Sequence, residues 1–116
     1  MRAICDYAKG SKVKIVIEPH GGYSNDPDWL LAVIKKLNHP NAGLLPDFNN
    51  FGHYDRYDGV KRTLAHAPAI CAKALNFDDK GNETRTDYYR MMKIIHQSSY
   101  SGVITIEFEG HKVCLL

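Results

Sequence analysis

Three carboxylate side chains are the residues of this sequence best suited to chemistry. Glu18, Asp47 and Glu107 each lie at or near the end of a short apolar run. An acid buried at a strand end is costly unless a cation neutralises it, and carboxylate oxygens are the ligands that hard divalent cations take. The pattern therefore points to a site at one end of a sheet. Capping or solvated acids at strand ends are the competing explanation.

Four runs of β-branched and other apolar residues predict the strands that would carry these acids. They cover residues 14–18, 42–45, 69–75 and 103–108. The first is stopped by Pro19 and the Gly21-Gly22 pair, and the second ends at Pro46-Asp47. Short apolar runs bounded by such turn residues are typical of buried strands.

Helical patterns separate the predicted strands. Apolar residues recur at helical spacing up to Leu37 after a start signal at 24–27, and further helices are expected over 58–66 and from about 86 to 96. Strands that alternate with helices indicate βαβ units and a parallel sheet, in which functional groups lie at the carboxyl ends of the strands. We expect a single α/β domain over residues 1–116.

Composition limits the partners and the compartment. The net charge is +2 from 15 basic and 13 acidic residues, which are interspersed, so neither nucleic acid nor a membrane is an expected partner. No apolar run is long enough to span a membrane, and the first residues lack the apolar stretch of a signal peptide. Cys5, Cys71 and Cys114 fit neither a disulfide framework nor a Cys-x-x-Cys zinc site. We therefore expect a cytoplasmic protein.

Four segments carry a resemblance to a known family. They are IEPHGG at 17–22, LPDFNNFG at 45–52, AK at 72–73 with NFDDKGNET at 76–84, and IEFEG at 106–110. In order and in spacing, these segments resemble strands five to eight of the xylose isomerase-like sugar isomerase and epimerase superfamily. The resemblance implies a partial (β/α)₈ TIM barrel of about four βα units, the C-terminal half of that fold, with the first four units and the closing helix absent.

The resemblance also implies a chemistry. Glu18, Asp47 and Glu107 would hold a divalent metal (Mn, Mg, Co or Zn) that bridges a substrate carbonyl and hydroxyl and stabilises an enediolate. Glu18 and Glu107 would be the catalytic residues that move the proton between adjacent carbons. The implied substrate is a small sugar or sugar phosphate, and the implied activity is that of an isomerase or epimerase.

Four further positions are candidates for the site. Cys71 stands where the family usually has its fourth ligand, a His, and is either a thiolate ligand suited to zinc or a core residue. Lys73 shares its face and would replace the charge of the metal among the acids, pair with one acid, or bind a substrate phosphate. His20 would contact substrate or metal, or only backbone. Asn50 would bind a substrate hydroxyl, or only shape its loop.

Three functions remain open from the sequence. The first is a sugar isomerase or epimerase, or a degenerate or fragmentary form of one. The second is a non-catalytic carbohydrate-binding or assembly module on the same scaffold. The third, a nuclease role suggested by the distant relative endonuclease IV, is weakest because the extra His ligands and a basic stripe are lacking. Since a half barrel has two open edges, we expect self-association that completes the barrel, or a fragment of a longer gene.

Overall fold

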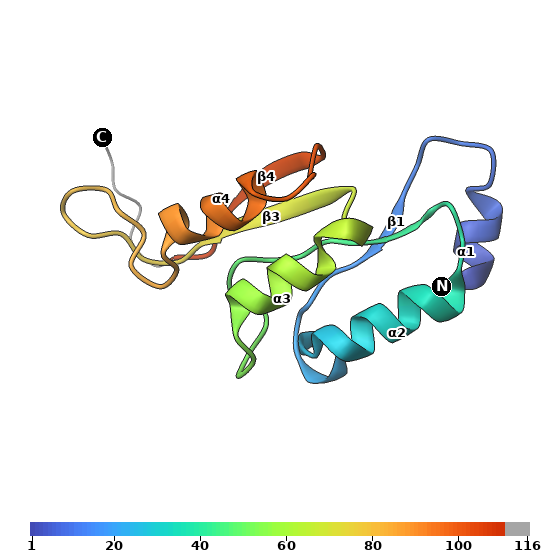
Figure 1. Ribbon diagram of the computed structural model, residues 1–116, viewed down its shortest axis with the longest axis horizontal. Coiled ribbons are helices and arrows are strands. Elements are labelled where there is room, and N and C mark those ends of the chain that lie inside the picture. Colours follow the sequence, from blue (N-terminus) through green and yellow to red (C-terminus); the bar gives the residue numbers. More distant parts are fainter. Residues whose placement is uncertain (111–116) are drawn as a thin grey trace.

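The computed structural model describes residues 1–110 as a layer of helices over a layer of parallel strands (Figure 1). Cys114 lies outside the described residues. Along the chain the elements are α1 (Arg2–Tyr7), β1 (Ile15–Ile17), the 3₁₀ helix η1 (Gly22–Asn25), α2 (Pro27–Leu37), β2 (Ala42–Leu44), α3 (Arg56–Thr63), the 3₁₀ helix η2 (Leu64–His66), β3 (Ala69–Ala74), α4 (Tyr88–His96) and β4 (Val103–Phe108). The four predicted strands are confirmed, and each of their ends lies within one residue of the prediction.

The strands pair in parallel and in chain order. β1 pairs with β2, and β3 pairs with β4. A parallel bridge between Asp47 and Cys71 joins the two sheets, through hydrogen bonds from the Phe48 amide to the Cys71 carbonyl (3.0 Å) and from the Cys71 amide to the Pro46 carbonyl (2.9 Å). The described residues therefore form an open four-strand arrangement and no closed barrel.

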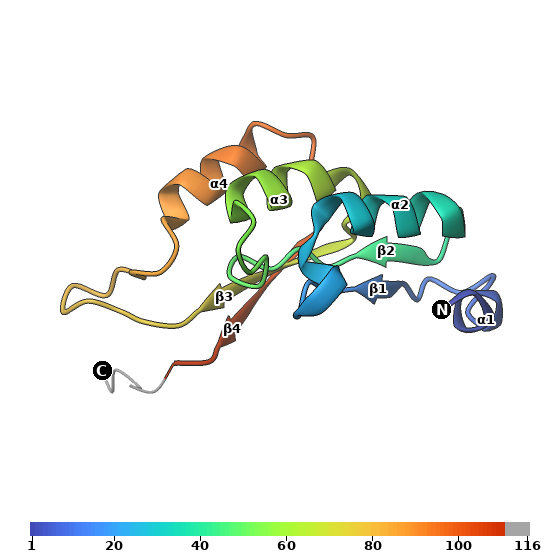
Figure 2. The same ribbon diagram turned by 90° about the horizontal axis from the view of Figure 1, so that it is seen from below.

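Helices α2, α3 and α4 cover one face of the strands (Figure 2). Each begins at an aspartate whose side chain accepts backbone N–H groups of the first turn: Asp26, Asp55 and Asp87. Helix α2 ends at Leu37 and is capped by Asn38, which adopts the left-handed conformation. Between the helices and the strands lies one core, made of Leu30, Ile34, Leu44, Phe48, Phe51, Val60, Leu64, Ile70, Ala72, Met91 and Ile95.

The sequence patterns did not predict α1, which lies at one end of the molecule (Figure 2). Its Arg2 guanidinium donates hydrogen bonds to the carbonyls of Leu37 (2.5 Å) and Lys36 (3.4 Å), the unpaired last carbonyls of α2. The segment after α1 is held by the buried Asn41, whose amide nitrogen donates to three of its carbonyls, those of Ala8, Ser11 and Val13. These tertiary contacts, rather than helical periodicity, place α1.

Strand β4 lies at the edge of the sheet. Val103 is 63% exposed and Ile106, on the opposite face of the strand, is 88% exposed. In contrast, β3 is almost wholly buried, because α4 covers one of its faces and β4 pairs with its edge. Among the described residues, no helix is long and apolar enough to span a lipid bilayer.

Candidate functional site

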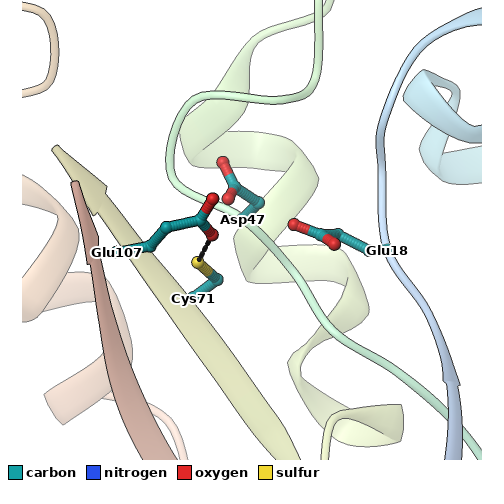
Figure 3. Close-up of side chains that lie close together, drawn as sticks. All are labelled: Glu18, Asp47, Cys71 and Glu107. Carbon is teal, nitrogen blue, oxygen red and sulfur yellow. Dashed lines mark hydrogen bonds between the residues drawn. The ribbon is translucent and has the colours of Figure 1, made fainter. Parts of the chain in front are cut away.

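Glu18, Asp47, Cys71 and Glu107 meet at the carboxyl end of the strands (Figure 3). Each offers one possible ligand atom, and these four atoms all lie within 4.8 Å of one another. Glu18 follows β1, Asp47 follows β2, Cys71 lies in β3 and Glu107 lies in β4. The structure thus brings together the three predicted acids and the predicted fourth position, although they are 24 to 89 residues apart in the chain.

Asp47 is the most deeply placed acid, with 0% exposure. Its Oδ1 accepts the backbone N–H groups of Asn49 (2.7 Å) and Asn50 (2.9 Å), which makes the turn after β2. Its Oδ2 is buried and has no hydrogen-bond partner among the described residues. Burial raises the pKa of Asp47, and the two backbone hydrogen bonds oppose that rise. A buried carboxylate oxygen without a donor is suited to accept a cation.

Glu107 and Cys71 form a hydrogen-bonded pair across β3 and β4. The Cys71 thiol donates to Glu107 Oε2 at 2.9 Å. That bond and the neighbouring Lys73 hold the pKa of Glu107 below its ordinary value. Burial, followed by the bond to Glu107, raises the pKa of the Cys71 thiol. A cysteine must be a thiolate to ligate a metal, so Cys71 serves in this arrangement as a hydrogen-bond donor that keeps Glu107 ionised.

Lys73 extends from β3 into the same cluster. Its side chain is 2% exposed, and its Nζ lies 3.1 Å from Glu109 Oε1, 3.2 Å from Glu107 Oε1 and 3.7 Å from Asp47 Oδ2. Burial lowers the pKa of Lys73, but hydrogen bonds to Glu109 and Glu107 outweigh it, so the pKa is raised overall. Lys73 is therefore held as an ammonium ion among these carboxylates, and whether it replaces the charge of a metal stays a prediction.

Glu18 closes the cluster from the side of β1. Burial raises its pKa, with a further rise from the Asp47 carboxylate, while Lys73 and His20 act in the opposite direction. The carboxyl pKa values of Glu18 and Glu107 are therefore shifted in opposite directions within one site, an arrangement that suits one acid and one base.

The predicted substrate contacts His20 and Asn50 are also placed beside Glu18. Asn50 Nδ2 lies 3.5 Å from Glu18 Oε1, and the Asn50 amide helps to make the Asp47 turn. His20 is exposed, and its backbone N–H donates to Ser24 Oγ at 2.8 Å. His20 is thus exposed and Asn50 half-buried, and a role of either in substrate binding stays a prediction.

A network that the sequence patterns did not predict anchors the loop after Asp47. Asn49 Nδ2 donates to the Lys73 carbonyl (2.7 Å), and Asn49 Oδ1 accepts from Arg56 and from the Thr86 hydroxyl (3.1 Å). Arg56 also donates to Thr86 Oγ1 at 2.8 Å. These residues come from β3, α3 and two loops, and only the position of Asn49 in the Asp-Phe-Asn segment hinted at a role.

Comparison with known proteins gives one family. The sequence model of the xylose isomerase-like TIM barrel matches residues 1–113. No curated protein matches the sequence.

Solved structures of the same kind share the fold. A D-allulose 3-epimerase from Methylomonas sp. superposes with a TM-score of 0.75 at 22% identity, over 92% of this chain and 39% of its own. An L-ribulose 3-epimerase superposes with a TM-score of 0.75 at 16% identity, over 92% of this chain and 38% of its own. An AP endonuclease of family 2 from Brucella melitensis superposes with a TM-score of 0.74 at 14% identity, over 96% of this chain and 46% of its own. The chain thus spans less than half the length of these proteins, and at these identities the likeness shows the fold alone.

Proposed function

The chain belongs to the xylose isomerase-like TIM-barrel family, and on that premise we propose that it carries the reacting centre of a sugar or sugar-phosphate isomerase or epimerase. The observation that supports this most directly is the meeting of Glu18, Asp47, Cys71 and Glu107 within 4.8 Å at the carboxyl end of parallel strands. Two of the similar structures are 3-epimerases of the ketoses D-allulose and L-ribulose by name. A ketose is therefore the proposed substrate class.

The residues present fit a divalent cation. Glu18, Asp47 and Glu107 would supply oxygen ligands, and the partnerless Asp47 Oδ2 is the acceptor that the fold leaves open. When bound, such an ion polarises a sugar carbonyl and lowers the energy of an enediolate. Oxygen ligands suit manganese or magnesium, and the protonated Cys71 thiol does not favour zinc.

The two glutamates divide the proton transfer in this proposal. Glu107 is ionised because Cys71 and Lys73 both donate to it, so it accepts the proton from the carbon next to the carbonyl. Glu18, whose pKa burial raises, returns a proton to the neighbouring carbon or the opposite face. Asn50, beside Glu18, would orient a substrate hydroxyl.

Turnover of a panel of ketoses and ketose phosphates in D₂O tests the function. We expect deuterium at the carbon next to the carbonyl, and loss of exchange by about 100-fold or more in Glu18→Gln and in Glu107→Gln. Asp79→Asn, which changes an exposed loop acid, is the matched control and should retain full exchange. Absence of exchange with every sugar of the panel would overturn the proposal.

A non-catalytic carbohydrate-binding or assembly module is the second candidate. The observation that favours it is that Lys73 already neutralises part of the acid cluster. Sugar binding that needs no metal, without deuterium exchange, would support this candidate over the first.

The barrel itself would be completed by residues beyond this four-strand unit. We propose that the edges of β1 and β4 pair with the other half of a barrel, either from a longer chain or from a second copy related by twofold symmetry. The exposure of Val103 and Ile106 on the two faces of β4 supports this. Sedimentation of the chain should give twice the mass of 13.1 kDa, whereas a monomer that unfolds cooperatively would count against a second copy.

A further inference from the structure

Lys73 contacts the same carboxylates that would bind a metal. Asp47 and Glu107 belong to the group whose ligand atoms lie within 4.8 Å of one another, and both are ion-paired to Lys73, at 3.7 and 3.2 Å. The side chains of Lys73 and Asp47 are 2% and 0% exposed, so water screens this pair weakly, whereas the Glu107 side chain is 39% exposed. A metal ion at this place would share its oxygens with a second positive charge.

The ammonium leaves one oxygen of the cluster unsatisfied. Asp47 Oδ2 is buried, and the 3.7 Å that separates it from Lys73 Nζ is too long for a hydrogen bond. Asp47 is 0% exposed, and its Oδ2 is turned into the cluster. A cation bound there would gain an oxygen ligand to which Lys73 is not hydrogen-bonded.

Glu109 supplies the place to which Lys73 would move. Glu109 Oε1 lies 3.1 Å from Lys73 Nζ, and the Glu109 side chain, one residue beyond the end of β4, is 49% exposed. If a metal took Asp47 and Glu107, Lys73 would keep Glu109 as a partner and reach toward solvent along a flexible four-carbon stem.

We propose that the Lys73 ammonium is the resident counter-ion of the acid cluster and that a divalent metal binds there only in competition with it. The inference rests on the proposed function, because it takes the acid cluster as the reacting centre. It gives the departure from the family pattern at Cys71 a structural role: the thiol donates to Glu107 Oε2 at 2.9 Å, and Lys73 supplies a positive charge to Asp47 and Glu107.

Manganese binding to the chelator-treated chain, measured by calorimetry without sugar, tests this competition. We expect Lys73→Met to bind Mn²⁺ at least about tenfold more tightly than the unaltered chain, because removal of the ammonium frees the two oxygens. Lys73→Arg, which keeps the charge, should bind as weakly as the unaltered chain. Lys80→Met, which removes an exposed loop lysine, should change nothing.

Two results would overturn the competition. One is a divalent ion held tightly, one per chain, by the unaltered protein through chelator treatment. The other is equal Mn²⁺ affinity in Lys73→Met and Lys73→Arg. If Lys73→Met unfolds when metal-free, recovery of its circular dichroism in millimolar Mn²⁺ supports the proposal, and failure to recover overturns it. Because no sugar is present, these outcomes are independent of ketose turnover, which tests the proposed function.

Discussion

Replacement of Asn49 by alanine tests whether the loop after Asp47 is held by the network described above. The substitution deletes three hydrogen bonds: to the Lys73 carbonyl (2.7 Å), from the Arg56 guanidinium, and from the Thr86 hydroxyl (3.1 Å). Two of the partners keep other contacts, because Arg56 still donates to the Arg85 carbonyl and to Thr86. The Lys73 carbonyl loses its side-chain donor.

The magnitude follows from these contacts. A neutral hydrogen bond contributes about 0.5–1.5 kcal/mol and one to a charged group about 1.5–3 kcal/mol. Since the retained contacts of Arg56 and Thr86 recover part of the loss, we expect the free energy of unfolding to fall by about 2–3 kcal/mol. The loss should be coupled to Arg56, with an interaction energy of about 0.5–3 kcal/mol in a double-mutant cycle with Arg56→Met.

Urea unfolding followed by circular dichroism measures both quantities. The midpoint should fall with an unchanged slope, which shows that stability changed and not compactness. Asn82→Ala is the matched control, because Asn82 is an exposed loop asparagine whose side chain bonds only Asp78 among the described residues. A loss in Asn49→Ala no larger than that of the control, or additive single and double variants, would refute the anchoring role.

Three further variants test the packing and the buried charges. In Gly59→Ala the added Cβ would lie 2.6–2.8 Å from ring atoms of the buried Phe51. The unfolding free energy should therefore fall by about 1–3 kcal/mol, although alanine has a helix propensity about 1 kcal/mol better than that of glycine. A variant that is more stable in urea than the unaltered chain would contradict this. Burial raises the pKa of Tyr88 from 10 to about 12, so the folded state keeps its phenol proton longer than the unfolded state and stability should decline between pH 10 and 12. In Tyr88→Phe this part of the decline should be absent. An equal fall in the unfolding free energy of both proteins between pH 10 and 12 would contradict the raised pKa. Burial likewise raises the pKa of Asp47 above its ordinary 3.8, so its contribution to stability is greatest below that value and diminishes as the pH rises through it. The free energy of unfolding of Asp47→Asn should therefore increase relative to that of the unaltered chain as the pH rises from 3.8. A difference between the two proteins that does not depend on pH would contradict this.

Much of the fold was predictable because local signals agree with it. The apolar run 103–108 is β4 itself, and the aspartates at 26 and 87 cap the helices that the periodicity placed after them. The helix predicted over 58–66 is split in the structure into α3 and η2, and it begins earlier, at Arg56. Its cap, Asp55, was missed because the first turn carries polar residues and shows no apolar spacing.

The site was predictable only as a set of positions. Parallel strands bring their carboxyl ends together, so Glu18, Asp47 and Glu107 could be expected at one edge. The ion pair of Lys73 with Glu109, at 3.1 Å, depends on how the side chains share the space beyond β4 and has no signature in spacing. Helix α1 was missed for a similar reason: six residues are too few for a periodic pattern, and Arg2 is held by carbonyls 34 and 35 residues away in the chain.

The register of β3 against β4 connects the fold to the cluster. Pairing sets Lys73 beside Glu107 and Cys71 beside Thr105. A slip of one residue would set Ile106 or Phe108 beside Lys73 and turn Glu107 and Glu109 to the other face. The buried ammonium would then lose two of its three carboxylate partners, which is costly in a protein interior. The Lys73 ion pairs therefore favour one register of β3 against β4, whether or not a metal binds at the cluster. Manganese affinity in Lys73→Met and Lys73→Arg separates the fixing of the register from the competition with a metal. If Lys73 only fixes the register, the two variants bind Mn²⁺ equally. If it also competes with the metal, Lys73→Met binds Mn²⁺ more tightly than Lys73→Arg.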